Sequence, residues 1–526
     1  MRHLANIGEV LRSYTQILPE KIGARDLDRS MTFRVWNERA CRLANALTGM
    51  GLSKGDRVAI LAYNCVEWVE FYAAAAKAGI VAVPINFRLV GAEIHFIIEN
   101  CEATALIVQD ELLGPIEEIR GDLPIKPANF IHFGTGRCPA GFRNYEELLA
   151  AAADREPAAD VRPEDPWTFM YTSGTTGRPK GAIRSHRASA QLSLITDVEM
   201  GFGRDDTALL VMPMCHANSL FFFGAFTYAG ATCAIYSRKS FDPEHFLRSL
   251  SEIGATFSSL VPTHYIMMLG LPASVRNQFK VDQISKLLVS SAPARRDTKL
   301  AIMEYFRNSG LFELYGSTEA GWVTMLHPEE QFTKLGSVGR ECVGSAPIKL
   351  LDHEGNEVPQ GEAGELFSNN PYTFDRYWKL PDKTAEAFRD DYCTVGDMAR
   401  RDEDGYIFLV DRKSNMIISG GENVYPSEVE NMLGGHPRIR EVAVIGMPDQ
   451  KWGERVHAVI VLTPGAAATE AELMEWCADK IAGYKRPRSI SFIQDDEMPR
   501  TATGKIQHRL LRNKLVPPSR PTGSRE

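Results

Sequence analysis

The stretch Tyr171-Thr-Ser-Gly-Thr-Thr-Gly-Arg-Pro-Lys-Gly181 follows a predicted strand and precedes a helix-like segment. Its glycines permit backbone geometry that other residues resist and let amide groups approach an anion. Hydroxyls of Thr172, Ser173, Thr175 and Thr176 can donate to phosphate oxygens, and Lys180 adds a positive charge. The spacing is not that of the P-loop signature. The stretch predicts a polyphosphate-binding loop in the strand–loop–helix order of an α/β fold.

Strand-like and helix-like segments alternate through the first four hundred residues, as they do on either side of this loop. Short apolar or β-branched runs alternate with helix-length stretches such as Val66–Lys77 and Asp242–Ile253, the latter opened by an N-cap Asp, a first-turn Pro and an acid. This pattern predicts mostly parallel sheets flanked by helices. The predicted strands are Arg57–Ala62, Val81–Ile85, Ala105–Val108, Thr168–Tyr171, Ala208–Met212, Thr232–Tyr236, Thr256–Leu260, Leu287–Val289 and Phe312–Leu314.

The pattern changes after about residue 345. Runs at Ile348–Leu351, Gly364–Ser368 and Tyr406–Leu409, separated by turn sequences, predict a small antiparallel, β-barrel-like subdomain over about 345–411. Strands at Val442–Ile445 and His457–Leu462 and a helix at Ala471–Ile481 predict a small α+β domain. We therefore expect an N-terminal domain over 1–411, a C-terminal domain over 412–515, and a disordered Pro- and Ser-rich tail over 516–526.

Composition and charge exclude several classes of function. The 526 residues are 44% hydrophobic and 24% charged, which is ordinary for a globular protein, and the net charge of −8 argues against non-specific nucleic-acid binding. Residues 1–411 carry −11 and residues 412–526 carry +3. Nine scattered cysteines without a CxxC pair favour a reducing, cytoplasmic location. No secretory leader is evident. The uncharged run 207–237 is interpreted as two buried strands flanking a loop and a helix, not as a membrane span.

Three further motifs carry chemistry. Tyr315-Gly-Ser-Thr-Glu319 offers a flat ring, a hydroxyl and a hard oxygen ligand for Mg²⁺. Val395-Gly-Asp397 and Asp411-Arg412 offer a carboxylate for ribose hydroxyls and a guanidinium for phosphate or ribose. Pro499-Arg-Thr-Ala-Thr-Gly-Lys505 places a lysine on a glycine-containing loop, where it can contact a developing anion or stand solvated.

The four motifs, in this order, resemble those of the adenylate-forming superfamily, and most closely those of aryl- and medium-chain acyl-CoA ligases. The resemblance runs from about Ile7 to Leu511. It implies an ATP-dependent reaction in two halves, with Mg²⁺, ATP and coenzyme A as cofactors and co-substrates. A carboxylate first attacks the α-phosphorus to give acyl-AMP and pyrophosphate, and the CoA thiol then displaces AMP.

The resemblance also implies roles for individual residues. The loop would hold the β- and γ-phosphates, Tyr315 would stack on adenine, Glu319 would bind Mg²⁺, and Lys505 would bridge the carboxylate and the α-phosphate. The catalytic candidates are Lys505, Glu319, Thr172 and Lys180. The ATP- and AMP-binding candidates are Thr172, Ser173, Gly174, Thr175, Thr176, Gly177, Lys180, Ser291, Ala292, Tyr315, Gly316, Thr318, Asp397 and Arg412.

Two further ligand sites follow from the resemblance. The acyl pocket would be lined by His216, Ser219, Phe222, Ser290, Gly316 and Trp322. CoA would contact Arg88, Gly420, Gly421, Trp452, Lys485 and Arg486, and Ser414 would be the hinge about which the C-terminal domain rotates between half-reactions. Alternative interpretations remain: His216 as a buried hydrogen-bonded histidine, Trp452 as a core residue, and the 485–488 run as a solvated basic face.

We expect a ligase that activates a hydrophobic monocarboxylic acid, either aromatic or medium- to long-chain aliphatic, because no lysine or arginine lies between Met212 and Ser237 to pair with a second carboxylate. Three alternatives stay open: a ligase that loads a carrier protein, a luciferase-like adenylating oxygenase, and a non-catalytic binding protein. The sequence does not fix the acid, or whether two copies of the chain form a homodimer.

Overall fold

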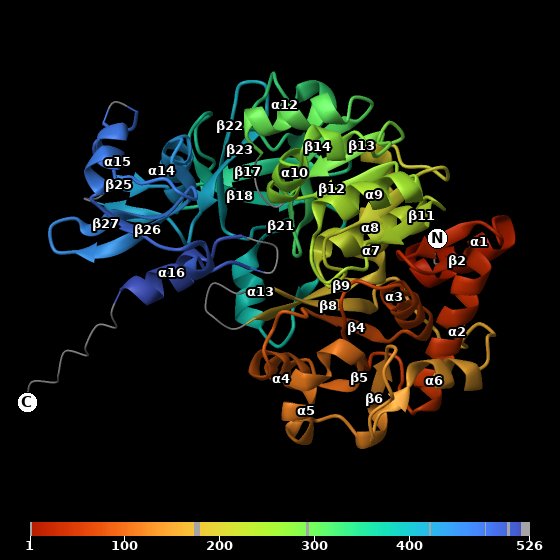
Figure 1. The fold of residues 1–526 in the computed structure, drawn as a ribbon. Coiled ribbons are helices and arrows are strands. Elements are labelled where there is room, and N and C mark those ends of the chain that lie inside the picture. The colour runs from red at the N-terminus through yellow and green to blue at the C-terminus, as the bar shows by residue number, and fades with distance from the viewer. Residues whose placement is uncertain are drawn as a thin grey trace, which may run out of the picture. The chain divides into compact units, whose positions relative to one another are not determined.

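The computed structural model describes residues 3–172, 179–290, 294–419, 422–478, 480–501 and 505–516. The chain divides into two compact units. Unit 1 comprises Met1–Ile348 and Ser368–Val395, and unit 2 comprises Lys349–Phe367 and Gly396–Glu526. The units are described separately below (Figure 1).

The first large sheet of unit 1 has eight strands in the order β19-β9-β8-β4-β3-β5-β6-β7. The six strands from β8 to β7 run parallel, and β9 and β19 are added antiparallel at one edge. The strands are β3 (Arg57–Leu61), β4 (Val81–Ile85), β5 (Ala103–Gln109), β6 (Phe130–Phe133), β7 (Arg143–Asn144), β8 (Pro166–Thr172), β9 (Lys180–Ser185) and β19 (Arg376–Tyr377).

Helices cover both faces of this sheet, which explains its continuous apolar strands. In β3, Val58 and Ile60 pack into a core with helices α2 and α3, whereas Ala59 and Leu61 pack into a second core with α4 and α5. Successive side chains of a strand point to opposite faces, so one apolar run supplies both cores. The helices are α1 (Ile7–Ile17), α2 (Phe33–Gly49), α3 (Glu67–Ala78), α4 (Gly91–Asn100), α5 (Leu113–Ile119) and α6 (Tyr145–Ala151).

The second large sheet of unit 1 has nine strands in the order β16-β15-β14-β13-β12-β10-β11-β1-β2. The strands from β14 to β1 are parallel, and the antiparallel β15, β16 and β2 close the two edges. The strands are β1 (Ile22–Arg25), β2 (Ser30–Thr32), β10 (Thr207–Leu210), β11 (Thr232–Ile235), β12 (Phe257–Leu260), β13 (Lys286–Val289), β14 (Gly310–Ser317), β15 (Gly321–Leu326) and β16 (Arg340–Glu341).

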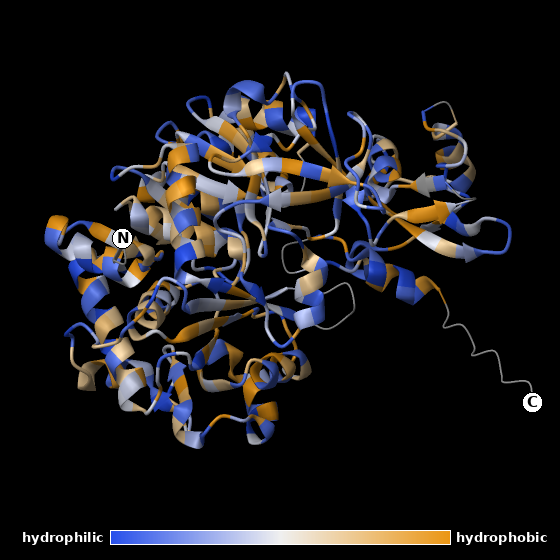
Figure 2. Cartoon of the chain, turned by 180° about the vertical axis from the view of Figure 1, so that it is seen from behind, coloured by the Kyte–Doolittle hydropathy of each residue, from blue (hydrophilic) through white to orange (hydrophobic). Residues whose placement is uncertain are grey.

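Two helices, α7 (His186–Met200) and α8 (Ala217–Tyr228), belong to the core that both sheets share. Their apolar side chains pack with strand residues of either sheet, such as Ile60 and Leu210, while Leu209 faces the separate core of α9, α10 and α12. Figure 2 shows the strands of these sheets as largely hydrophobic. The remaining helices of unit 1 are α9 (Pro243–Ile253), α10 (Pro262–Leu269), α11 (Ala273–Arg276), α12 (Arg296–Tyr305) and α13 (Pro381–Ala387).

Unit 2 contains antiparallel strand pairings and a small α+β sheet. Strand β22 (Asp397–Arg401) pairs antiparallel with β23 (Ile407–Arg412) and with the start of β18 (Gly364–Asn369), which also pairs with β17 (Ala346–Leu351). The small sheet has the order β25-β24-β27-β26, with β28 parallel to β27. Its elements are β24 (Ile417–Ser419), β25 (Glu422–Val424), α14 (Pro426–Gly434), β26 (Ile439–Asp449), β27 (Gly453–Leu462), α15 (Glu470–Trp476), β28 (Ser489–Phe492) and α16 (His508–Leu515).

The predicted fold class is confirmed, with two differences in the C-terminal elements. The predicted strand Val442–Ile445 extends over Ile439–Asp449, because β26 and β27 form one hairpin paired along its whole length. The predicted helix Ala471–Ile481 ends at Trp476, where the N–H groups of Cys477 and Ala478 bond to carbonyls three residues back and tighten the last turn. The predicted tail from residue 517 lies outside the described residues.

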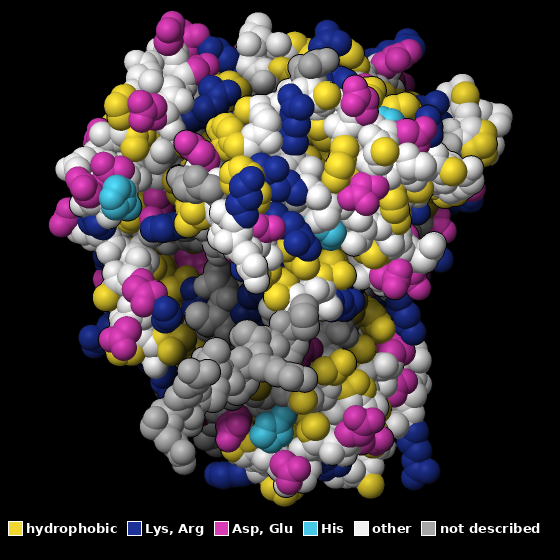
Figure 3. All heavy atoms as spheres, turned by 90° about the vertical axis from the view of Figure 1, so that its left-hand side faces the viewer, with side chains coloured by type: hydrophobic (Ala, Val, Ile, Leu, Met, Phe, Trp, Pro, Cys, Tyr) yellow, Lys and Arg dark blue, Asp and Glu magenta, His cyan; other side chains and the backbone are white. Residues whose placement is uncertain are grey.

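The run 207–237 forms β10, α8 and β11, as predicted from its proline, histidine and glycines. Across the described part of the chain, helices that combine the length and the apolarity needed to cross a bilayer are absent. Figure 3 shows one face of the molecule, on which side chains of both charge signs are interspersed with apolar ones.

Candidate active site

Thr172 and Lys180 lie opposite each other where the predicted phosphate loop leaves and re-enters the eight-stranded sheet. Thr172 ends β8, Lys180 begins β9, and the two residues are partners in the antiparallel ladder. The sheet therefore fixes a hydroxyl and an ammonium at the base of the loop. The loop candidates Ser173, Gly174, Thr175, Thr176 and Gly177 lie outside the described residues.

Glu319 lies in the turn that joins β14 to β15, closed by a hydrogen bond from the Ala320 N–H to Ser317 Oγ (2.9 Å). Its side chain is buried, and its Oε1 accepts hydrogen bonds from Thr172 Oγ1 (3.1 Å) and the Tyr377 hydroxyl (2.8 Å). Among the described residues, none donates a hydrogen bond to Oε2. One carboxylate oxygen is thus held in place and the other is left to a ligand.

Tyr377 connects the carboxylate to the lysine, and sequence analysis did not identify it. Its hydroxyl donates to Glu319, and the Lys180 Nζ lies 4.0 Å from the centre of its ring, a cation–π contact. Burial and the charge of Glu319 raise the pKa of Tyr377 far above its ordinary value, so the phenol stays a donor. The residue is brought there by β19, which pairs with β9 through Tyr377 and Ala182.

Arg184 is a second residue that sequence analysis missed. It is fully buried in β9, and its guanidinium donates to the carbonyls of Thr318 (2.8 Å) and Tyr372 (2.6 Å). Burial lowers its pKa to about 10, against the opposing charges of Asp375 and Glu319. Arg184 therefore stays charged at neutral pH and holds the turn that carries Thr318 and Glu319. The signal in the sequence is that Arg184 directly follows the apolar residues Ala182 and Ile183 of its strand.

The end of β14 is shaped by a bulge between Tyr315 and Gly316. Tyr315 is largely buried opposite Thr324, and Gly316 lies opposite Trp322. A Cβ atom on Gly316 would lie 2.3 Å from the carbonyl oxygen of Gly321, so only glycine fits. The adenine-side candidates Ser291 and Ala292 lie outside the described residues.

The side chains at this edge suit a Mg²⁺–polyphosphate ligand. Mg²⁺ prefers carboxylate oxygens and retains waters and phosphate oxygens in its shell, and Glu319 presents a carboxylate with an uncommitted oxygen. Lys180 and the Thr172 hydroxyl add the charge and the donor that phosphate oxygens need. The residues present therefore fit both the metal and the nucleotide phosphates.

The acyl-pocket candidates divide into two groups. Three of them turn toward the core: Ser219 Oγ donates to the Met212 carbonyl (2.6 Å), Phe222 packs against Trp322, and the Trp322 indole N–H donates to Thr196 (2.8 Å). The others lie at the carboxyl ends of parallel strands. Ser290 directly follows β13, Gly316 lies near the end of β14, and His216 immediately precedes α8.

His216 is uncharged at neutral pH. Burial, reinforced by the positive charge of Arg88, lowers its pKa to about 4, and the same two causes lower the pKa of His264 to about 4. Its Nε2 is buried and has no hydrogen-bond partner among the described residues. Arg88, a CoA-binding candidate, lies with its guanidinium 5.5 Å from the Phe87 ring centre.

In unit 2, the ribose candidates Asp397 and Arg412 are partners in the ladder of β22 and β23. Arg412 Nε lies 3.2 Å from Asp397 Oδ1, and the carboxylate is largely buried while the guanidinium is half exposed. The hinge candidate Ser414 lies in the turn that follows β23, between Lys413, which is ion-paired with Glu365 (2.8 Å), and Asn415.

The CoA candidates of unit 2 have different partners. Trp452 has the Arg488 guanidinium 4.1 Å and the Lys451 ammonium 4.7 Å from its ring centre. Lys485 is ion-paired with Glu428 (2.6 Å), and Arg486 donates to the carbonyls of Ala478 and Ile481. Gly420 and Gly421 lie outside the described residues.

Lys505 closes a short hairpin near the C-terminus. The Thr501 N–H donates to the Lys505 carbonyl (2.7 Å), and the Lys505 N–H donates to Thr501 Oγ1 (3.1 Å). An isolated bridge between Arg500 and Ile506 flanks this contact. The exposed Lys505 is therefore held at the base of its loop by the backbone.

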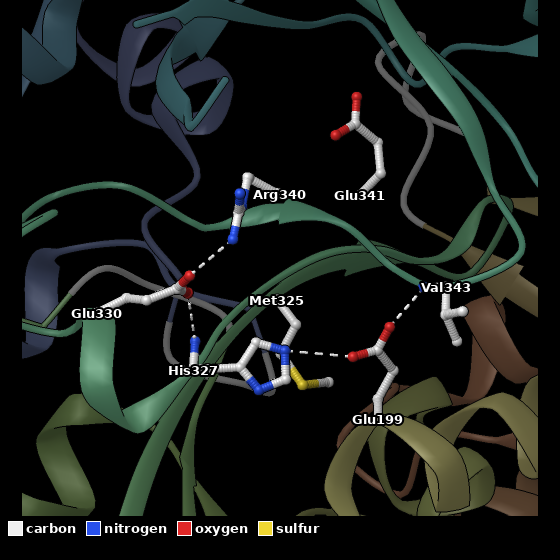
Figure 4. A pocket seen from close by; sticks show the side chains of 7 residues that line it. All are labelled: Glu199, Met325, His327, Glu330, Arg340, Glu341 and Val343. Carbon is white, nitrogen blue, oxygen red and sulfur yellow. Dashed lines mark hydrogen bonds and ion pairs between the residues drawn. The ribbon is translucent and has the colours of Figure 1, made fainter. Parts of the chain in front are cut away.

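A separate cavity of about 250 Å³ in unit 1 is lined by Glu199, Met325, His327, Glu330, Arg340, Glu341 and Val343 (Figure 4). Four of its charged side chains form two pairs: His327 Nε2 lies 3.2 Å from Glu199, and Arg340 lies 3.1 Å from Glu330. Glu341 accepts a hydrogen bond from the Ile348 N–H (2.8 Å). The hydrogen bond to Glu199 raises the pKa of His327. We interpret this cavity as a structural junction between the end of α7 and the strands β15 and β16.

Comparisons with known proteins agree with this geometry. The family model described as AMP-binding enzyme matches residues 15–378, and that of the AMP-binding enzyme C-terminal domain matches 428–505. A feruloyl-CoA synthase of Amycolatopsis sp is 35% identical over 93% of this chain and 94% of its own length. The fatty acid–[acyl-carrier-protein] ligase ScoC of Streptomyces coeruleorubidus is 33% identical over 93% and 92%. The crystal structure of the anthranilate CoA ligase AuaEII with anthranoyl-AMP superposes with a TM-score of 0.88, at 30% identity over 97% of each chain.

The chain therefore belongs to the AMP-binding enzyme family. It is an adenylate-forming acid–thiol ligase, as the resemblance of its motifs predicted. Ligases of this kind use ATP, Mg²⁺ and CoA, in agreement with the chemistry of the side chains around Glu319.

Proposed function

We propose that the protein is an ATP-dependent carboxylate–CoA ligase that activates a hydrophobic monocarboxylic acid, aromatic or medium- to long-chain aliphatic. The observation that carries this proposal is the group of Thr172, Lys180, Glu319 and Tyr377, which places a hydroxyl, a cation and a partly committed carboxylate at one edge of unit 1. Adenylation is an in-line displacement at phosphorus, for which positioned charge is the main requirement.

We assign roles as follows. Thr172 and Lys180, with the loop between them, bind the β- and γ-phosphates, Thr318 binds the α-phosphate, and Tyr315 contacts adenine. Glu319 would hold Mg²⁺, which when bound neutralises phosphate charge. Asp397 and Arg412 bind ribose, and Lys505 stabilises the charge that develops as the carboxylate attacks. CoA is assigned to Arg88, Trp452, Lys485 and Arg486.

The test is a screen for ATP-dependent pyrophosphate release with benzoates, cinnamates and C2–C16 fatty acids, each with and without CoA. We expect release with a subset of monocarboxylates, and acyl-CoA and AMP as final products when CoA is present. The same screen with dicarboxylates should give little release, because the acyl-pocket candidates include no cation. Absence of release with every acid would contradict the proposal.

A second candidate is a ligase that transfers the acyl group to the phosphopantetheine thiol of a carrier protein. It is favoured by the similarity to ScoC over more than nine-tenths of the chain. Both candidates share the adenylation step, so the acceptor distinguishes them. Acyl transfer to CoA at a rate at least comparable to that of transfer to a carrier protein with a free phosphopantetheine thiol supports the first candidate. Transfer to the carrier protein alone supports the second.

A further inference from the structure

A cluster of uncharged polar side chains lies at the carboxyl ends of two neighbouring parallel strands of unit 1. Asn218, in the first turn of α8, donates from Nδ2 to Ser259 Oγ (3.0 Å) and Ser290 Oγ (3.1 Å). Ser259 belongs to β12 and Ser290 directly follows β13, and their hydroxyls lie 3.5 Å apart. We call Asn218, Ser259 and Ser290 the amide–serine cluster.

The cluster lies on the edge of the sheet that carries the proposed nucleotide-binding residues Thr318 and Glu319. β13 is flanked by β12 and by β14, and β14 runs directly into Thr318 and Glu319. Ligands of α/β sheets bind at the carboxyl ends of the strands. An acyl group joined to the α-phosphate near Thr318 is therefore placed at the same edge as Ser290.

The described residues do not use up the hydrogen-bonding capacity of the cluster. Asn218 Oδ1 is buried and has no hydrogen-bond partner in the described part of the chain, and the same holds for Nε2 of His216 at the start of the same helix. If the amide were turned by 180°, its NH₂ group would be left over instead, so the conclusion does not depend on this assignment. Leaving a buried polar atom without a partner is costly, so a ligand group that bonds to it is favoured.

The chemistry of these atoms selects the kind of group that would satisfy them. An amide and two hydroxyls carry no charge, and His216 is neutral. The cluster itself holds no counter-charge for a carboxylate or an ammonium, and the positive charge of Arg88, which acts on His216, lies outside it. Burying an unpaired ion is far more costly than burying a hydroxyl. The surroundings are apolar, since Phe221 and Phe222, one turn further along α8, pack against Trp322.

We propose that the acid activated by this enzyme carries an uncharged hydrogen-bonding substituent, such as a hydroxyl, aromatic amine or amide, on its apolar skeleton. Asn218 binds this substituent with the support of Ser259 and Ser290, and His216 offers a further hydrogen bond. The inference rests on the proposed adenylation of a monocarboxylate and narrows its substrate class. It makes Asn218 a specificity-determining residue.

The test compares matched pairs of acids that differ by one substituent: benzoate with its hydroxy and amino derivatives, cinnamate with hydroxycinnamates, and decanoate with hydroxydecanoates. We expect kcat/KM for pyrophosphate release to favour the substituted member of at least one pair by about tenfold or more, because a site built to hydrogen-bond a group rejects the analogue that lacks it. Asn218→Leu should abolish this preference mainly by lowering kcat/KM for the substituted acid.

A control variant and a second variant of the cluster complete the test. Asn277→Leu makes the same chemical change at an exposed residue after α11 and should keep the wild-type preference. Ser259→Ala/Ser290→Ala, a smaller change, should reduce the preference even if Asn218→Leu fails to fold. The inference is overturned if the enzyme is active but prefers the unsubstituted acid of every pair. It is also overturned if the preference is unchanged in the cluster variants. Absence of release with any acid overturns the proposed function instead.

Discussion

Tyr377 is the residue that joins Lys180, to which we assign phosphate binding, to Glu319, to which we assign Mg²⁺. Its hydroxyl donates to Glu319 Oε1 at 2.8 Å, and its ring lies under Lys180. Tyr377→Phe keeps the ring and removes the hydrogen bond, which to a charged acceptor contributes about 1.5–3 kcal/mol. We expect the Mg²⁺ concentration for half-maximal pyrophosphate release to rise about tenfold or more, with kcat at saturating Mg²⁺ close to wild type.

A second substitution separates the two contacts of Tyr377, the hydrogen bond of its hydroxyl to Glu319 and the contact of its ring with Lys180. Tyr377→Leu also removes the ring, so we expect it to raise the KM for ATP in addition to the Mg²⁺ requirement. Tyr305→Phe deletes a hydroxyl that donates to the Arg276 carbonyl (2.9 Å) and should change neither quantity. Unchanged Mg²⁺ dependence in Tyr377→Phe, with a lowered Tm, would mean that the tyrosine serves only packing.

The residues of the site that sequence analysis identified are those whose motif is continuous. Thr172 and Lys180 flank one glycine-rich loop, and Glu319 ends a five-residue motif, so local spacing was sufficient. Tyr377 is about two hundred residues from Lys180 and reaches it only because β19 adds to the edge of β9. No short sequence pattern predicts such a long-range contact. Arg184 gave a weaker signal, since it follows two apolar residues of β9 and a buried arginine requires partners.

At the scale of the element, the parallel strands were predictable because both of their faces are covered. β4, for example, occupies the predicted range Val81–Ile85, since it is apolar throughout and bounded by a turn. The end of α15 was not predictable from its apolar spacing, because the hydrogen bonds that close it at Cys477 depend on backbone geometry. The length of β26 depends on its partner β27, a long-range property that a window of residues does not contain.

Helix α7 contains a carboxyl group that makes its stability depend on pH. Burial, with a smaller effect of the nearby Asp206 charge, raises the pKa of Asp197 to about 9, and its Oδ1 has no hydrogen-bond partner among the described residues. Because the folded state holds this proton and the unfolded state releases it near the ordinary pKa of 3.8, stability is lost as pH rises from about 4 to about 9. Asp197→Asn removes this dependence. We expect the Tm difference between this variant and wild type to shift by several degrees in favour of the variant between pH 5 and pH 9.

The control for this prediction is a neighbouring carboxylate. Asp205 is exposed, so Asp205→Asn makes the same change in charge without a buried group and should leave the difference in Tm between pH 5 and pH 9 as in wild type. Thermal unfolding followed by circular dichroism at both pH values measures the effect. A stabilisation of Asp197→Asn that is equal at pH 5 and pH 9 would contradict the assignment of the shifted carboxyl.

At the scale of the whole molecule, the sequence predicted a large α/β part and a small α+β part, and the fold agrees. The two units do not divide at one position such as residue 412. Lys349–Phe367 and Gly396–Glu526 belong to unit 2, whereas the segment between them belongs to unit 1. The chain passes between the units within β18, which pairs with β22 at its start and with β21 (Tyr392–Cys393) at its end. The boundary at 412 remains a prediction.

The catalytic candidate Lys505 belongs to unit 2, whereas the predicted phosphate loop belongs to unit 1. A Lys505 variant therefore leaves the loop unchanged, and its effect on each half-reaction can be measured separately. A cation stabilises the negative charge that develops when a carboxylate attacks the α-phosphorus, whereas thiol attack on a preformed acyl-AMP begins from an already activated carbon. Lys505→Ala should therefore lower pyrophosphate release by about a hundredfold or more, while acyl-CoA formation from supplied acyl-AMP stays within a few-fold of wild type. The exposed Lys514→Ala on α16 is the matched control and should affect neither step. Equal loss in both half-reactions would assign Lys505 to the structure of unit 2, whereas a selective loss of adenylation would show that the two half-reactions draw on different side chains of one chain.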